Sequence, residues 1–210
     1  MRVIKKPEVR KAEILDAAEK LFNTKGYETA TINDILIALN ISKGAFYHYF
    51  KSKEEVLDES IEKYISERVS RAEKIAVSSL SPVQKFFEII SGQKLQSKTE
   101  EIFLPSISSF NEKDNAKMHK KIITEYISRL SPCLSKIVKE GIDVGLFSTS
   151  LPNESVEIIL AAGLVLLNYD FFPLAKEKME AKAVTFLTVT ERILGAKTGV
   201  LSELFKPPAN

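Results

Sequence analysis

The side chains best suited to binding DNA lie in one short run, Ser-Lys-Gly-Ala-Phe-Tyr-His. Lys43 can bind a phosphate or a guanine edge, while Gly44 and Ala45 are small enough to let a helix backbone approach the bases. The methyl group of Ala45 also suits the methyl group of thymine. Tyr47 and His48 add hydrogen-bond donors on rigid rings. A helix that places this run in a DNA groove can bind both phosphates and base edges.

Residues for catalysis or metal binding are sparse by comparison. The two histidines, His48 and His119, and the one cysteine, Cys133, do not have the spacing of metal ligands. The sequence has no glycine-rich phosphate-binding loop, and adjacent carboxylates such as Glu54 and Glu55 are better explained as acidic residues at a helix start. We therefore expect no catalytic residue, no metal site, no cofactor and no enzymatic activity.

Two short helices, over residues 31–39 and 42–50, are expected to position the DNA-binding run. Thr31 and Ser42 are hydroxyl residues of the kind that cap helix N-termini. Asn40 suits the left-handed conformation that ends a helix. These proportions are those of a helix-turn-helix, whose second helix lies in the major groove with its N-terminal residues against the base edges.

Helical periodicity dominates the rest of the chain, and neither a strand pattern nor an internal repeat is found. A first helix is expected from Pro7 to Gly26, before the helix-turn-helix. A long helix without internal glycine or proline is expected from Ser52 to about Ser79. The fold class is therefore all-α, an N-terminal three-helix unit joined by a long helix to a second helical domain. Further helices are expected over about 82–97, 100–110, 114–144, 153–172 and 174–195.

The charge is distributed unevenly along the chain. Residues 1–53 carry ten Lys and Arg against six Asp and Glu, a net +4, although the whole chain has a net charge of only +2. The remaining residues therefore sum to −2. A basic first quarter on a nearly neutral body favours a local contact with phosphates.

The sequence favours a cytoplasmic protein without a membrane segment. Its basic start is not followed by the apolar run of a signal peptide. The longest apolar stretch, residues 158–167, is about half as long as a bilayer span. A single cysteine cannot form an internal disulfide, which fits a reducing compartment.

Several motifs together resemble the N-terminal part of the TetR family of transcriptional regulators, over about residues 8–57. The chain departs from the family pattern at Leu36 and Leu39, where small alanines are common, and at Asn40, where glycine is usual. The motifs are Ile14-Leu-Asp-Ala-Ala-Glu-Lys-Leu-Phe, Gly26-Tyr, Thr31-Ile-Asn-Asp-Ile and Ile41-Ser-Lys-Gly-Ala-Phe-Tyr-His-Tyr-Phe-Lys-Ser-Lys-Glu-Glu.

The resemblance implies a DNA-binding domain over residues 1–51 and an effector-binding and dimerisation domain over residues 52–210. It implies that the partner is double-stranded DNA, bound by a homodimer. Lys43, Gly44 and Ala45 are then expected to lie closest to the bases. The residues expected to bind mainly phosphates are Thr31, Ser42, Tyr47, His48 and Lys53.

The resemblance also implies a small-molecule cavity among the helices between residues 82 and 172. The large apolar side chains there suit a small, largely apolar effector, and most of them must also form the core. The candidate pocket residues are Phe86, Phe87, Ile90, Phe103, Phe110, Met118, Ile122, Tyr126 and Asn168.

The helix over residues 156–172 is apolar around nearly its full circumference. A helix of this kind must be covered on all sides, and a partner subunit is the economical cover in a protein of this size. With the helix over residues 174–195 it would form a four-helix dimer contact, as the family does. The expected interface residues are Ile159, Leu160, Leu164, Leu167 and Phe186.

The main hypothesis is thus a repressor that binds a palindromic operator as a homodimer and is released by a small effector. The alternative is a DNA-docked adaptor whose body binds another protein and has no small-molecule site. An all-helical enzyme with an accidental helix-turn-helix is disfavoured because the sequence offers no pair of catalytic groups.

Overall fold

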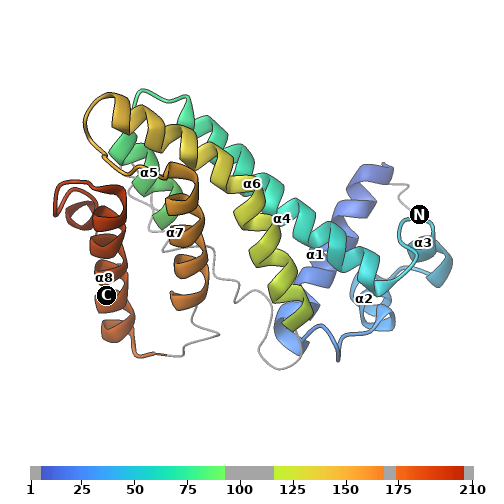
Figure 1. The fold of residues 1–210 in the computed structure, drawn as a ribbon. Coiled ribbons are helices and arrows are strands. Elements are labelled where there is room, and N and C mark those ends of the chain that lie inside the picture. Colours follow the sequence, from blue (N-terminus) through green and yellow to red (C-terminus); the bar gives the residue numbers. More distant parts are fainter. Residues whose placement is uncertain (1–5, 93–115, 168–173, 206–210) are drawn as a thin grey trace. The chain divides into compact units, whose positions relative to one another are not determined.

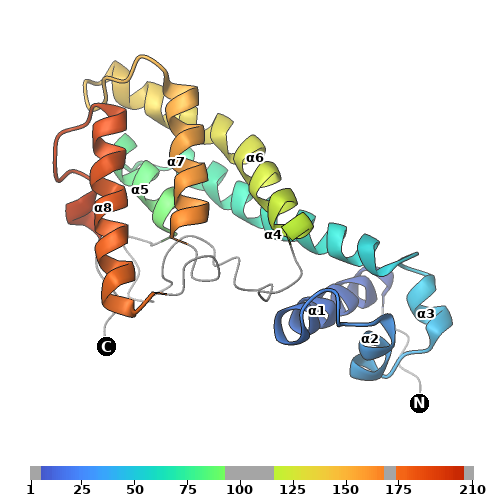
Figure 2. The ribbon, with the colours of Figure 1, turned by 60° about the horizontal axis from the view of Figure 1, so that its bottom comes forward.

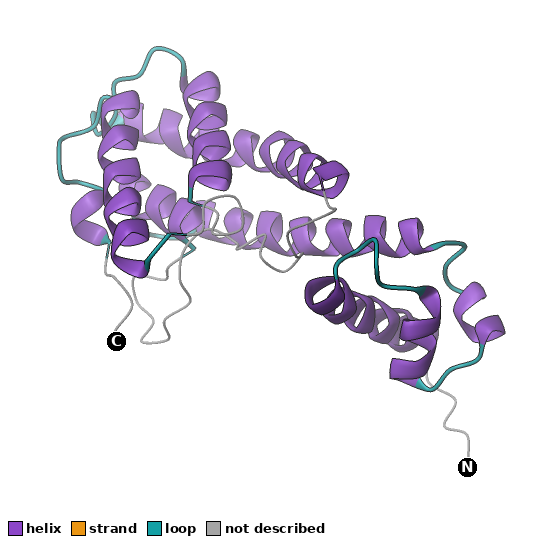
Figure 3. Ribbon diagram, turned by 90° about the horizontal axis from the view of Figure 1, so that it is seen from below, coloured by secondary structure: helices purple, strands orange, loops and turns teal. Residues whose placement is uncertain are grey.

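The computed structural model describes residues 6–92, 116–167 and 174–205 of the 210-residue chain. All regular secondary structure in these ranges is helical, which confirms the expected all-α fold (Figure 1, Figure 3). The helix expected over residues 100–110 lies outside them. The helices are α1 (Pro7–Lys25), α2 (Ile32–Leu39), α3 (Lys43–Tyr47), α4 (Lys53–Ala76), α5 (Pro82–Ser91), α6 (Ala116–Asp143), α7 (Pro152–Leu166), α8 (Lys176–Leu194) and the short 3-10 helix η2 (Ser202–Leu204).

The chain forms two compact units. The first contains α1, α2, α3, the part of α4 that ends at Glu67 and the start of α6 to Ile122. The second contains the remainder of α4 and α6 together with α5, α7 and α8. Helix α4 therefore contributes residues to both units.

Local capping fixes where several helices begin and end. At the start of α2 the Thr31 hydroxyl accepts a hydrogen bond from the Asp34 amide at 3.1 Å, and the Asp34 carboxylate accepts one from the Thr31 amide at 2.8 Å. Ser81 and Gln84 repeat this reciprocal pair at the start of α5, at 3.3 and 3.1 Å. Asn40 ends α2 in the left-handed conformation, with φ 49° and ψ 52°. These caps confirm the helix boundaries expected at these positions. The boundaries could be predicted because a cap depends only on residues close together in the sequence.

The core of the first unit joins all of its helices. Phe22 of α1, Ile35 of α2 and Phe46 of α3 are fully buried, and α2 packs against both α1 and α3. Three other apolar residues of α2 are only partly buried, namely Ile32, Leu36 and Leu39. Further fully or nearly fully buried residues are Ile14, Ala18, Ala30, Phe50, Val56, Ile61 and Ile65. This core holds the helix-turn-helix in a fixed orientation.

Helix α5 is the most completely buried helix of the second unit. Every residue of α5 except Gln84 is buried, including Phe86 and Phe87. Its Lys85 is also buried and forms an ion pair with both carboxylate oxygens of Glu140, at 3.0 and 3.1 Å. The pair satisfies a charge that burial would otherwise make costly.

Helices α7 and α8 lie side by side and pack against each other (Figure 2). The residues expected to need a partner subunit, Ile159, Leu160, Leu164 and Leu167, are at most 9% exposed within the single chain. Phe186, on α8, is half-buried. The expected interface residues on α7 are therefore core residues of their own chain, because the pattern of α7 specifies burial but not which molecule provides it.

The segment after α8 docks onto the second unit, at least as far as Phe205. The buried Glu191 carboxylate accepts hydrogen bonds from the amides of Gly199, Leu201 and Ser202 at 2.9, 2.8 and 2.8 Å. Burial alone raises the pKa of Glu191, but these amide donors together hold it below its ordinary value. Leu201 is fully buried and Phe205 nearly so.

Within the described residues, no helix is both long enough and apolar enough to cross a membrane. The longest apolar stretch of the sequence, residues 158–167, lies almost entirely in α7, which ends at Leu166 and belongs to the second unit.

Candidate nucleic-acid interface

Helix α3 is anchored by its inward face. Phe46 is fully buried and Phe50 is 1% exposed, and their rings lie 5.9 Å apart. Ser42 begins the helix, because its hydroxyl accepts a hydrogen bond from the Ala45 amide at 3.2 Å. The regular helix ends at Tyr47 rather than at residue 50, although the Phe50 amide still donates to the Phe46 carbonyl at 3.1 Å. The buried phenylalanines and the Ser42 cap therefore fix the position of the residues on the outward side of α3.

Six of the eight residues expected to read bases or bind phosphates lie in α3 or directly beside it. Ser42, Lys43, Gly44, Tyr47 and His48 are exposed, and Ala45 is half-buried. The Lys43 ammonium lies 5.9 Å from the centre of the Tyr47 ring. Tyr47 remains 45% exposed, which is unusual for a side chain of its size. The face of residues 42–48 is called the α3 surface below.

The folded chain does not require a glycine at position 44. A β-carbon added at this position would meet no atom within 4 Å, and its backbone does not have a positive φ. Glycine inside a helix is less favourable than alanine by roughly 1 kcal/mol. The fold itself therefore does not explain why this position is a glycine.

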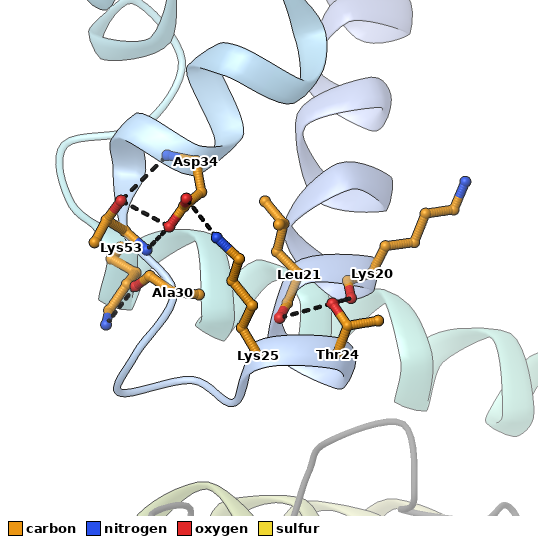
Figure 4. Close-up of polar contacts among 8 residues, drawn as sticks. Lys20, Leu21, Thr24, Lys25, Ala30, Asp34 and Lys53 are labelled. Atoms are coloured by element: carbon orange, nitrogen blue, oxygen red, sulfur yellow. Dashed lines mark hydrogen bonds and ion pairs between the residues drawn. The ribbon is translucent and has the colours of Figure 1, made fainter.

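Thr31 belongs to a polar cluster at the start of α2. Figure 4 shows Asp34 and Lys25 of this cluster in contact. The exposed Thr31 hydroxyl donates to the Asp34 carboxylate at 2.8 Å, and the Lys25 ammonium at the end of α1 reaches that carboxylate at 2.7 Å. The hydrogen bond from Lys25, followed by those from the Thr31 amide and hydroxyl, lowers the pKa of Asp34 to about 2. The sequence identified Thr31 and Asp34 as a cap, but the ion pair with Lys25 has no local pattern that would predict it.

Lys53 has a different environment from the other expected phosphate ligands. It is half-buried, and its ammonium donates to the carbonyls of Tyr27, Ala30 and Glu28 at 2.7, 3.0 and 3.2 Å. The ammonium also lies 4.3 Å from the centre of the Tyr27 ring. An ammonium has three hydrogens to donate, so these carbonyls use them all. The structure thus places Lys53 against the loop between α1 and α2 rather than on the α3 surface.

The expected pocket residues that the structure describes are buried. Phe86 and Phe87 are fully buried, and Ile90 is 2%, Ile122 1% and Tyr126 3% exposed. Burial raises the pKa of Tyr126 to about 12, against a smaller opposing effect of the nearby Arg68 and Arg71 charges. Phe103, Phe110 and Asn168 and the side chain of Met118 lie outside the described residues.

Metal-ligating and nucleophilic chemistry finds little support in the described part of the chain. No cluster of three or more His, Cys, Asp and Glu residues able to hold a metal ion occurs there. Cys133 is half-buried, and burial followed by the negative charge of Glu73 raises the pKa of its thiol. A raised pKa leaves less of the reactive thiolate.

Comparisons with protein families match both parts of the chain. Residues 14–59 match the model of bacterial regulatory proteins of the tetR family. Residues 92–189 match the model of the tetracyclin repressor-like C-terminal domain. The two matches together include the helix-turn-helix and most of the second unit.

Relatives in sequence are named as helix-turn-helix transcriptional regulators. The uncharacterized HTH-type transcriptional regulator YhgD of Bacillus subtilis is 27% identical over 146 residues, which cover 68% of this chain and 72% of YhgD. The HTH-type transcriptional repressor KstR2 of Mycolicibacterium smegmatis is 32% identical over 79 residues, 38% of each protein. The chain thus aligns with little more than a third of KstR2.

Solved structures share the fold. The reduced form of E. coli NemR has a TM-score of 0.67 at 17% identity and covers 89% of this chain and 98% of its own. RolR in complex with resorcinol has a TM-score of 0.61, also at 17% identity, and covers 97% of this chain and 96% of its own. Both similarities extend beyond the helix-turn-helix to the helical C-terminal part.

Proposed function

Because this chain belongs to the TetR family of bacterial regulatory proteins, we propose that it is a repressor that binds a palindromic operator as a homodimer and is released by a small molecule. It is a helix-turn-helix transcriptional regulator, and its relatives include repressors. Such a protein would act in the cytoplasm, where its DNA lies. The observation that carries the proposal is the α3 surface, with an exposed tyrosine, an exposed lysine and a glycine that the fold does not require.

We assign the residues of the α3 surface two roles. Lys43, Gly44 and Ala45 lie in the first turn of α3 and read the base edges, since this part of a recognition helix enters the major groove most deeply. Ser42, Tyr47 and His48 bind phosphates and set the register of the helix on the duplex. Thr31 adds a phosphate contact from the start of α2.

Two substitutions separate these roles. Replacing Lys43 with alanine should change which bases the protein selects from a random duplex library. Replacing Tyr47 with phenylalanine removes one hydroxyl group and should weaken binding to all sequences similarly, because phosphate contacts carry no sequence information. If Lys43→Ala selects the same sequence as the wild type, the assignment of Lys43 to the bases is wrong.

The homodimer is supported by the apolar residues that α7 and α8 leave exposed. Ile158 and Leu166 of α7 are 59% and 44% exposed, and Val184 and Val189 of α8 are 41% and 44% exposed. Alanines lie between the two exposed residues of α7, at positions 161 and 162, and would allow close approach. We call Ile158, Leu166, Val184 and Val189 the α7–α8 surface.

Polar groups on the same side of α8 are already satisfied. The hydroxyls of Thr185 and Thr188 donate to the carbonyls of Ala181 and Val184 at 2.9 and 3.0 Å. Covering these threonines therefore leaves no unmet donor, whereas an unpaired buried polar group costs about 1–3 kcal/mol. A second copy of the chain is the proposed cover, and its twofold symmetry would match the symmetry of a palindromic operator.

A small-molecule effector is proposed to bind in the second unit, among the aromatic residues of α5 and α6. Phe86, Phe87, Ile90 and Tyr126 are buried apolar side chains that include one hydroxyl group, the composition of pockets that orient a ligand through a few polar groups. The structural relative RolR was solved with resorcinol, a small aromatic molecule, which supports an effector of this class. Phe103, Phe110, Met118, Ile122 and Asn168 remain candidate contacts from the sequence.

The proposed release depends on α4. This helix runs from Lys53 to Ala76 without glycine or proline, and it contributes residues to both units. A displacement at its C-terminal end can therefore be transmitted to its N-terminal end. The effector can change DNA affinity only by the difference between its affinities for the DNA-binding conformation and the released conformation. Such a difference is typically about 1–3 kcal/mol.

A further inference from the structure

We propose that Lys53 is a positioning residue that holds the loop between α1 and α2 in place, and that its ammonium does not bind phosphate. The inference rests on the DNA-binding function proposed above, because the loop leads directly into Thr31 and α2. It departs from the role that the sequence favoured for this lysine. The loop over residues 26–30 is called the α1–α2 loop below.

The carbonyl groups of the α1–α2 loop converge on one point. Those of Tyr27, Glu28 and Ala30 all lie within 3.2 Å of the Lys53 ammonium. Three carbonyl oxygens that face one another repel unless a cation or donor lies between them, and here the ammonium occupies that position. The loop conformation therefore depends on a group supplied by the first residue of α4.

Aromatic contacts fix the same site. The ammonium of Lys53 lies 4.3 Å from the centre of the Tyr27 ring, a distance that favours a cation–π interaction. Tyr27 in turn meets the fully buried Phe22 edge to face, with ring centres 5.2 Å apart. The cation is thus connected to the core of the first unit and is not a mobile surface charge.

An ion pair connects the start of α2 to the end of α1. Lys25, the last residue of α1, binds the Asp34 carboxylate, and Asp34 forms the reciprocal cap with Thr31 (Figure 4). The N-terminus of α2 is therefore held by Lys25 from α1 and, through the carbonyl of Ala30, by Lys53 from α4. Consequently, the first turn of α4 and the start of α2 move together.

A phosphate ligand would need different chemistry. To bind a phosphate with its ammonium, Lys53 would have to release at least one of three carbonyls and leave that oxygen without its donor. Arginine distinguishes the two roles, since its planar fork binds phosphate at least as well as lysine does but does not fit three converging carbonyls. A positioning role therefore predicts that Lys53→Arg is defective, and a phosphate role predicts that it is not.

The first test labels lysines in the wild-type protein. A short pulse of an acetylating reagent is applied to the full chain, with and without a saturating duplex that the protein selects from a random library, and each lysine is quantified by mass spectrometry. Lys51, which is exposed and lies two residues earlier, is the matched control. Without DNA, Lys53 should react several-fold more slowly than Lys51, and DNA should protect Lys43 while changing Lys53 little.

The opposite pattern would overturn the inference, namely a Lys53 that reacts as fast as Lys51 without DNA and becomes protected when DNA is added. The DNA-free half of the experiment needs no duplex. A chain that binds no DNA would contradict the proposed function through an unprotected Lys43, while the slow reaction of Lys53 would still be measured.

The second test uses variants of the full chain. For Lys53→Met and Lys53→Arg we expect weaker DNA binding with the slope of log affinity against log salt unchanged, together with faster amide exchange at residues 27–31 in the DNA-free protein. Lys43→Met is the control, and it should lower the slope by up to about 0.9, because it removes a positive charge from the surface that meets the DNA. Normal binding by Lys53→Arg, or a lower slope in Lys53→Met, would establish a phosphate contact instead. If Lys53→Met does not fold, the acetylation experiment still decides.

Discussion

At Gly44 the chain accepts a conformational cost that its own fold does not require. A methyl group there has free space around it, and the backbone is already helical in the absence of any positive φ. We therefore attribute the small size of this residue to the proposed contact with DNA. Lys53 shows the opposite relation between sequence and structure. The sequence suggests a surface cation, whereas in the structure its ammonium donates hydrogen bonds to backbone carbonyls of the same unit.

Gly44→Ala should separate stability from function. We expect the free energy of unfolding to rise by about 0.5–1 kcal/mol, because alanine favours the helix, and DNA affinity to fall, because the methyl group meets the duplex. Denaturant unfolding and fluorescence anisotropy measure the two effects. An unchanged affinity in the stabilised variant would remove the argument that α3 approaches DNA at this position.

Asp34 should make the α2 cap sensitive to acid. Its pKa is lowered from 3.8 to about 2, chiefly by the hydrogen bond from Lys25, so its contribution to stability is complete above pH 3.8 and is lost as the pH falls toward 2. The melting temperatures of the wild type and Asp34→Asn should therefore differ at neutral pH and converge over this interval. A constant difference between the two would show that the carboxylate charge does not stabilise the cap.

At the level of the helices, the sequence predicts where a helix begins better than where it ends. It also does not predict which part of the chain buries an apolar helix face. Ser81 and Thr31 begin their helices as expected because a cap depends on residues three positions apart. The end of α3 at Tyr47 was not predicted, since the Phe46 and Phe50 spacing fits a longer helix. Nor could the apolar pattern of α7 indicate that its own chain buries Leu164, because burial by α8 depends on how distant segments pack.

The same limit applies to the candidate site. The α3 surface could be predicted because Ser42 to His48 are contiguous and their helical spacing separates inward phenylalanines from outward residues. The environment of Lys53 could not be predicted, since its acceptors lie 23 to 26 residues earlier in a loop without regular structure. Long-range contacts made by backbone carbonyls leave no pattern of side chains in the sequence.

The two sides of α7 should respond differently to a charge. Ile158→Glu places a carboxylate on the exposed α7–α8 surface and should give folded monomers. Leu164→Glu places it at a residue that is only 2% exposed and should destabilise the fold by at least about 3 kcal/mol. Sedimentation together with circular dichroism distinguishes the outcomes. A wild-type chain that sediments as a monomer would contradict the homodimer, and an Ile158→Glu variant that remains a dimer would place the interface elsewhere.

For the whole molecule, a repressor that is released by an effector must show reciprocal coupling. Operator DNA should weaken effector binding by the same factor by which the effector weakens DNA binding, roughly 5- to 150-fold. Calorimetry of a small aromatic ligand, first identified by thermal-shift screening, with and without saturating operator measures this factor. Equal affinities in the two titrations would favour the alternative, an adaptor that docks on DNA and binds another protein.

The central claim is that two copies of the chain read a symmetric DNA site through α3. Footprinting of the purified protein on the DNA that flanks its own coding region tests it most directly. We predict one protected site with two inverted halves, their centres about one helical turn or a small multiple of it apart, which Gly44→Ala and Ile158→Glu both weaken. Protection of a single asymmetric segment, or none at concentrations where the protein is dimeric, would contradict the account.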